Sequence, residues 1–210
     1  MAEKKEPKKE AKKEPVKSVK GFYHYMKKAW RNPTEADIIE QRKKMITWRA
    51  GNRITKLEKP TRLDRARNLG YKAKKGVLVY RVVIGRGGRQ KPRPTVKRRS
   101  KRFSVMKILK MNYRWVAEQR FQKEFRNLEV LNSYLIGKDG KYYIYEVIAL
   151  DRNAPEIKAD PQYNWVLNPS NQFRALRGLT SAGKKSRGLR RKSRNMKVRP
   201  SIRSWGRKGK

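Results

Sequence analysis

The sequence predicts an α+β fold in which helices pack on a small mixed or antiparallel sheet and long basic extensions leave it. Two apolar runs joined by a glycine-bearing turn indicate a hairpin, and apolar residues at helical spacing flank it. Two long stretches without any acid indicate the extensions. About 130 residues between the extensions are enough for one modest core, so we expect a single folded domain.

The strands are expected in the middle of the chain. Residues 128–136 (LEVLNSYLI) and 142–150 (YYIYEVIAL) are joined by GKDG at 137–140, which predicts a hairpin. Residues 76–84 (GVLVYRVVI) are rich in β-branched side chains and apolar on both faces apart from Arg81. That pattern is typical of an inner strand, which we expect to pair with the hairpin.

Helices are expected on both sides of the strands. Ser104 is a candidate N-cap for a helix over 104–125 that lies across the sheet. Thr34 and Asp37 have the spacing of a helix cap, and a further short helix is expected over 21–30 (GFYHYMKKAW). The apolar positions that support the first two helices are Val105, Ile108, Leu109, Trp115, Val116 and Phe121, and Ile38, Ile39, Met45 and Ile46.

The charge points to a polyanionic partner. The chain has 59 Lys and Arg against 17 Asp and Glu, a formal charge of +42 on 210 residues. Such self-repulsion opposes folding, and nucleic acid is the commonest polyanion that would remove it. An anionic membrane surface is the weaker alternative, because the sequence has no long apolar run and no apolar signal-peptide core. The absence of cysteine excludes disulfides and thiolate sites and fits a reducing compartment.

The position of the charge strengthens this inference. Residues 65–117 hold 18 Lys and Arg and no acid, and residues 161–210 hold 15 and no acid. An ordinary solvated surface mixes both signs, so these two stretches predict nucleic-acid contact. Residues 1–20 and 161–210 contain too few apolar residues to offset the entropy of ordering. We therefore divide the chain into a flexible charged extension (1–20), a globular domain (21–151) with a basic loop (85–102), and an extended basic segment (152–210).

Catalysis is not expected. Gly178, Gly183 and Lys184 resemble a phosphate loop, but the next position is Lys185 instead of the hydroxyl that would hold magnesium. No apolar strand precedes the motif, and no acid follows it to bind the metal. The only histidine, His24, cannot form a zinc site without cysteines. We predict no enzyme activity, cofactor, metal or small-molecule substrate.

Nucleic-acid contacts are expected in two segments. In residues 85–102 (GRGGRQKPRPTVKRRSKR), glycines allow close approach to phosphate, prolines keep the chain extended, and arginines match phosphate oxygens. The small residues over 178–183 suit a tight backbone path beside the cations that follow them. Trp205, in a basic tail, is the best candidate to stack on a base; the other interleaved aromatics are Tyr71, Phe103, Trp165 and Phe173.

Five ordered segments carry a family resemblance: residues 21–30, 60–82, 86–94, 131–151 and above all 177–189 (RGLTSAGKKSRGL). Together they resemble the archaeal and eukaryotic large-subunit ribosomal protein family numbered fifteen with the suffix e. The resemblance implies an α/β-layered domain, basic extensions threaded through large-subunit rRNA, contacts to neighbouring ribosomal proteins and no catalysis. Residues 1–20 depart from the family pattern, and the final twenty agree with it mainly in composition.

The expected function is therefore that of a cytoplasmic, archaeal-type structural constituent of the large ribosomal subunit, which stabilises rRNA through basic loops and extensions. The alternative is a free protein that compacts nucleic acid or takes part in RNA processing. The residues predicted to bind RNA are Arg62, Arg65, Arg67, Lys72, Lys74, Lys75, Arg86, Arg89, Lys91, Arg93, Lys97, Arg98, Arg99, Lys101, Arg102, Arg174, Arg177, Lys184, Lys185, Arg187, Arg190, Arg191, Lys192, Arg194 and Trp205.

Overall fold

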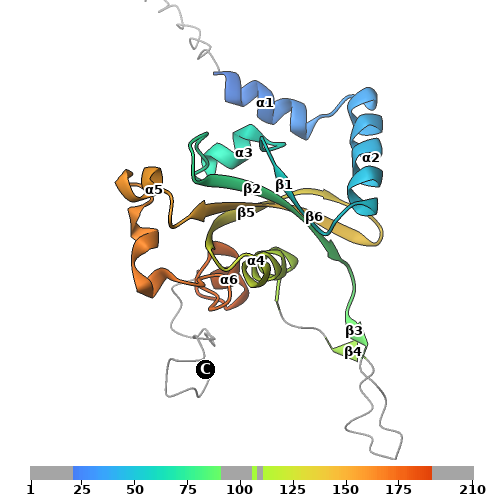
Figure 1. Ribbon diagram of the computed structural model, residues 1–210. Helices are drawn as coiled ribbons and strands as arrows, with labels where there is room; N and C mark the ends of the chain where they lie inside the picture. The colour runs from blue at the N-terminus through green and yellow to red at the C-terminus, as the bar shows by residue number, and fades with distance from the viewer. Residues whose placement is uncertain (1–20, 91–105, 108–110, 191–210) are drawn as a thin grey trace, which may run out of the picture.

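The centre of the protein is a four-stranded antiparallel sheet (Figure 1). The structure is a computed structural model that describes residues 21–90, 106–107 and 111–190. The strand order is β1-β2-β6-β5, and the strands are β1 (Ile54–Leu57), β2 (Val77–Gly85), β5 (Leu128–Lys138) and β6 (Tyr142–Asp151). The predicted α+β class, the hairpin and the inner strand are confirmed, with β2 paired to β6 from Val77 opposite Leu150 to Gly85 opposite Tyr142.

Helices cover both faces of this sheet (Figure 1). On one face lie α1 (Phe22–Arg31), α2 (Glu35–Ala50) and α3 (Leu63–Asn68), and on the other lie α4 (Tyr113–Glu124) and α6 (Ser181–Ser186). The remaining elements are α5 (Pro155–Ala159), the 3-10 helices η2 (Asn164–Leu167) and η3 (Pro169–Asn171), and the separate strand pair β3 (Arg89–Gln90) and β4 (Met106–Lys107). Because both faces are covered, residues 144–150 of β6 are buried without interruption.

The core has two halves, one on each face of the sheet. On the α4 face, Phe121 packs with Val82 and Val147. On the α3 face, Ala66 packs with Val79 and Ile148. Alternate residues of β2 and β6 therefore supply opposite halves, as the two-residue period of a strand requires.

The predicted helices α1 and α2 are present. Thr34 and Asp37 cap α2 reciprocally: the Asp37 N–H donates to Thr34 Oγ1 at 3.3 Å, and the Thr34 N–H donates to Asp37 Oδ2 at 3.0 Å. The apolar side of α2 is not buried in the core, however. Ile39 and Ile46 are 52% and 53% exposed.

The helix predicted from Ser104 begins later. Met106 and Lys107 form β4, and α4 starts at Tyr113. Asn112 is the N-cap, because its Oδ1 accepts a hydrogen bond from the Trp115 N–H at 2.7 Å. Ser104 itself lies outside the described residues. The prediction was wrong at this end, since Met106 and Lys107 pair with β3 as a strand instead of continuing the helix.

The segment after residue 152 also differs from the expectation. As far as residue 190 it is not an extension but packs on the sheet, where Ile157, Val166 and Ala175 are completely buried. The segment has few apolar residues, yet these occupy core positions, and buried carboxylates of α4 and β5 bind its polar groups. The expectation for residues 1–20, 91–102 and 191–210 lies outside the described residues.

This packing predicts hydrogen-exchange protection in the protein without RNA. We expect slow exchange at the Leu179, Lys184 and Arg187 amides, whose N–H groups donate to the backbone oxygens of Arg174, Thr180 and Gly183 at 2.9, 2.8 and 3.0 Å. Hydrogen exchange read by mass spectrometry measures this, with residues 128–150 as the protected reference. Exchange of residues 174–187 as fast as that of an unfolded peptide would show that the segment folds only on a partner.

Candidate nucleic-acid interface

The N-terminus of α4 joins two basic segments that lie about a hundred residues apart in the sequence. The Gly87 N–H donates to the Tyr113 hydroxyl at 2.9 Å, and that hydroxyl donates to the Gly87 oxygen at 3.3 Å. The preceding residue, Asn112, donates from its N–H to Ser186 Oγ and from Nδ2 to the Ala182 oxygen, each at 3.0 Å. We call these five residues the α4 junction.

Cations surround the α4 junction. Lys184 and Lys185 in the last turn of α6 are exposed and form no ion pair within the part of the chain that the structure describes. Arg86 donates to the Asp139 backbone oxygen at 2.6 Å, and its guanidinium lies 4.9 Å from the Tyr143 ring centroid. The lysine side chains are therefore exposed to solvent, whereas Arg86 is oriented by the fold.

The two glycines of the phosphate-loop-like pattern contact each other. A Cβ added at Gly183 would lie 2.6 Å from the Gly178 Cα, and Gly178 itself has φ of +70°, which favours glycine. The backbone N–H of Gly183 donates to Thr180 Oγ1 at 3.2 Å, and that of Lys184 donates to the Thr180 oxygen at 2.8 Å. These N–H groups are used to cap α6, so the glycine spacing is explained by backbone packing instead of nucleotide binding.

Two buried carboxylates hold the chain that leads to α6. Glu118 of α4 accepts hydrogen bonds from Thr180 Oγ1 at 2.5 Å and from Ser133 Oγ, and the Arg114 Nε lies 3.8 Å from it. Glu129 of β5 accepts from the Phe173 and Arg174 N–H groups at 2.8 and 2.9 Å. Burial raises the pKa of both carboxyls, and these hydrogen bonds oppose that rise.

Sequence reasoning missed these two carboxylates. The site residues predicted from the sequence include no acid. One available indication was the position of Glu129 between Leu128 and Val130 in a strand, where an acid among core residues needs partners. The hydrogen-bond partners of these carboxylates lie in residues 173–180, and no local sequence pattern relates residues so far apart.

Side chains from α4 and from the segment before α6 also cover the edge strand β5. Arg114 donates to Ser133 Oγ at 2.8 Å and to Asn132. Gln122 donates to the Leu128 oxygen at 2.7 Å, and Arg174 contacts the Val130 oxygen at 3.4 Å. Burial lowers the pKa of Arg114 and Arg174 but leaves guanidinium groups charged at neutral pH.

A second group of predicted cations lies around α3, on the opposite face of the sheet from α4 (Figure 1). Arg62 contacts Asp64 at 3.4 Å and lies 4.8 Å from the Trp30 ring. Lys74 pairs with Asp160 at 3.2 Å. The structure therefore does not gather all predicted residues into one patch.

The other predicted residues fall into four groups. Arg65, Lys75 and Arg190 are exposed, and Arg190 bonds Ser181. Several cations contact the fold itself: Arg67 bonds Tyr23, Lys72 lies 4.0 Å from Asp160, Arg174 stacks 4.5 Å from the Trp165 ring, and Arg177 and Arg187 donate to backbone oxygens. Arg89 lies in β3. Outside the described residues are Lys91, Arg93, Lys97, Arg98, Arg99, Lys101, Arg102, Arg191, Lys192, Arg194, Trp205 and the aromatic Phe103.

The three described aromatic residues among the predicted stacking candidates differ in how exposed their rings are. Tyr71 is 8% exposed and belongs to the core. Trp165 is partly buried beneath Arg174. Phe173 is 36% exposed and has φ of +52°, so it is the most accessible of the three.

The described residues contain no group of three or more His, Cys, Asp or Glu that could hold a metal ion. His24 is exposed on α1 with its ring 5.7 Å from that of Tyr25. A search of the same residues finds no helix with the length and apolar character needed to span a bilayer.

The sequence matches the model of a known protein family. The sequence model of the ribosomal L15e family, whose description is "Ribosomal L15", matches residues 21–205. The match includes the sheet, both segments held at the α4 junction and most of the chain beyond residue 190.

Proposed function

The chain belongs to the ribosomal L15e family of large-subunit ribosomal proteins, and from this premise we propose that it binds and stabilises large-subunit rRNA through the α4 junction and its two basic segments. The resemblance expected from the five sequence segments is confirmed by the family match. A ribosomal protein family of this kind implies association with rRNA and other ribosomal proteins and gives no indication of catalysis.

The observation that carries the proposal is the attachment of both basic segments to consecutive residues. Asn112 binds α6, and Tyr113 binds the start of the loop over 85–102. Because no acid occurs in residues 65–117 or 161–210, one continuous phosphate backbone can meet both segments without repulsion. The fold supplies the rigid base from which the basic residues reach the RNA.

The remaining assignments follow from the same proposal. The 25 residues predicted from the sequence contact rRNA, those around α3 on a separate surface from those at the α4 junction. Residues 1–20 form a charged extension, residues 21–151 the RNA-binding domain, and residues 152–210 a basic segment whose first part is folded. The protein acts in the cytoplasm, in the large subunit beside other ribosomal proteins.

Residence in the ribosome separates this proposal from the alternative of a free protein that compacts or processes RNA. Sucrose-gradient fractionation in high salt, followed by mass spectrometry, should find the chain in the large-subunit peak in a constant ratio to the other subunit proteins. Recovery only from the top of the gradient would reject the proposal and leave the alternative.

Salt dependence tests the α6 lysines. Substituting Lys184 and Lys185 with alanine should reduce the log–log salt slope of binding to purified large-subunit rRNA by about 1–2, because each released phosphate contact contributes roughly 0.7–0.9. The matched control is the double alanine variant of Lys43 and Lys44, an exposed pair on α2 near the acids Glu35 and Glu40. Equal slopes for the two variants, measured by filter binding, would remove α6 from the interface.

A further inference from the structure

We infer that a basic pocket between the start of β1 and the last turns of α4 binds a phosphate of the large-subunit rRNA backbone. The pocket has a volume of about 550 Å³, and its walls carry three cations, Arg53, Arg120 and Lys123. The other lining residues are Ile54, Val82 and Glu124. We call it the β1–α4 pocket. The inference rests on the proposed function and adds a site that none of the predicted RNA-binding residues belongs to.

The three cations of the β1–α4 pocket are exposed. Their side chains form no ion pair or hydrogen bond with residues 21–90, 106–107 or 111–190. Predicted cations near α3 differ in this respect, because Lys72 and Lys74 both lie within 4.0 Å of the Asp160 carboxylate. Within the part of the chain that the structure describes, the charges around the pocket are therefore not neutralised.

Two of the cations lie side by side on a fixed helix. Arg120 and Lys123 are three residues apart in α4, which makes them neighbours on its surface. Phe121, which lies between them in sequence, is completely buried, and Gln122 donates to the Leu128 oxygen at 2.7 Å. The backbone that carries the two cations is therefore held by the core before any ligand binds.

The third cation comes from the residue before β1. The Arg53 backbone oxygen accepts a hydrogen bond from the Val83 N–H at 2.9 Å, and Ile54 is paired opposite Val82. Ile54 and Val82 contribute to the half of the core on the α4 face. Strand pairing and core packing thus bring Arg53 to the same pocket as two cations that are far from it in sequence.

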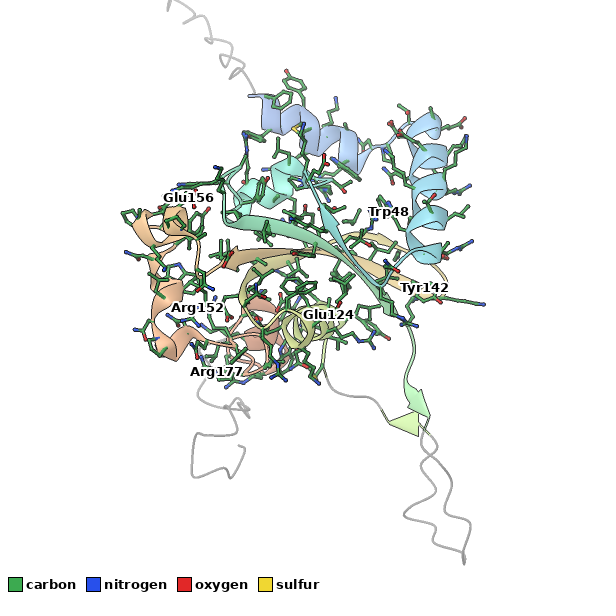
Figure 2. The ribbon with its side chains drawn as sticks, viewed as in Figure 1. Trp48, Glu124, Tyr142, Arg152, Glu156 and Arg177 are labelled. Carbon is green, nitrogen blue, oxygen red and sulfur yellow. The ribbon has the colours of Figure 1, made fainter. Side chains whose placement is uncertain are left out.

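The lining of the β1–α4 pocket selects an anion. It carries three cations and one acid, Glu124 at the end of α4 (Figure 2), and therefore has a net charge of +2. The guanidinium fork of an arginine matches two phosphate oxygens, and a lysine adds a point charge. Two arginines and one lysine around one pocket provide the donors that bind a phosphodiester.

The position of the pocket favours RNA over an acidic segment of a protein. Tyr113 of the α4 junction and Arg120 are seven residues apart, so they lie on nearly the same face of α4 and about 10 Å apart along its axis. An RNA strand that meets the α4 junction can therefore reach the β1–α4 pocket by following the helix. Each of its nucleotides carries a phosphate that the pocket can take.

A double-mutant cycle on purified large-subunit rRNA tests the inference. In filter binding with excess unrelated RNA as competitor, Arg53→Gln and Arg120→Gln should each lower the affinity of the full chain about fivefold. If the two cations contact one phosphate, the double variant should lose about tenfold instead of the roughly 25-fold expected for independent sites. The matched control is Arg42→Gln, an exposed cation of α2 outside the pocket, whose effect should multiply with that of Arg53→Gln.

Wild-type affinity of both single variants would overturn the inference, as would effects of Arg53→Gln and Arg120→Gln that multiply in full. Absence of the wild-type chain from the large-subunit peak of a high-salt gradient would overturn the proposed function instead.

Photocross-linking in purified large subunits identifies what occupies the pocket. Glu124→p-benzoylphenylalanine places the probe in its exposed wall. After irradiation, we expect the probe to join a nucleotide of large-subunit rRNA. Attachment only to an acidic segment of another protein, to this chain or to nothing would overturn the inference.

Discussion

Replacing Glu118 with alanine should lower the free energy of unfolding by about 3–5 kcal/mol, because it leaves a partly buried arginine without its carboxylate. Glu118 is completely buried, and Arg114 lies 3.8 Å from it with a side chain only 24% exposed. The substitution also removes the acceptor of the Ser133 and Thr180 hydroxyls. Urea denaturation followed by circular dichroism measures the change.

The control for this substitution is Glu124→Ala, an exposed position in the last turn of the same helix (Figure 2). We expect a change below about 0.5 kcal/mol there, since exposed positions without special contacts tolerate substitution. Glu118→Gln should fall between the two because it keeps one acceptor oxygen. If Glu118→Ala costs no more than Glu124→Ala, the carboxylate does not hold α4 to the segment before α6.

Gly183→Ala should displace α6 from its position beside Gly178 and α4 and cost about 1–3 kcal/mol, the typical penalty of overpacking a close contact. The new Cβ would meet the Cα, carbonyl carbon and oxygen of Gly178 at 2.6–2.9 Å, and backbone atoms cannot rotate away as a side chain could. Alanine has the higher helix propensity by about 1 kcal/mol, so the propensity gain only partly offsets the clash.

Two measurements test this substitution. Hydrogen exchange of residues 178–187 in the RNA-free protein reports whether α6 loses protection, and the salt slope of rRNA binding reports whether the interface is affected. The control is Gly140→Ala in the hairpin turn, where a Cβ would have no neighbour within 4 Å. We expect faster exchange and weaker rRNA binding for Gly183→Ala alone. Unchanged protection would mean that the backbone near Gly178 adapts and that the glycine pair is not required for the position of α6.

Several parts of the fold followed from local pattern. The hairpin and the inner strand were predicted because their apolar runs are long and the turn between 137 and 140 is distinctive. The cap at Thr34 was predicted because its partner Asp37 is three residues away. The start of α4 was missed because Asn112 and Ser104 are both good caps, and only pairing of β4 with the distant β3 decides between them.

The candidate interface was less predictable. Composition identified Lys184 and Lys185 as candidates, but it could not show that Asn112 and Tyr113 would place them near Gly87. Composition also could not show that the basic segment before α6 folds. Its folding depends on contacts between residues far apart in the sequence: Glu129 accepts a hydrogen bond from the Arg174 N–H, and Ala175 packs in the core. A sequence pattern predicts the local structure of one segment, whereas contacts between distant segments determine which basic residues lie close together in the fold.

The side chains that cover β5 also protect this edge of the sheet from association with a second copy of the protein. An open strand edge lets a second copy add a strand, and in a free basic protein mutual repulsion works against this association. If the chain binds rRNA as proposed above, the phosphates neutralise that repulsion. Gln122 and Arg174 already occupy backbone groups of β5, while β1 at the other edge has only four residues. The hydrogen bonds from Gln122 and Arg174 therefore oppose strand addition at β5 even when charge repulsion between two copies has been neutralised.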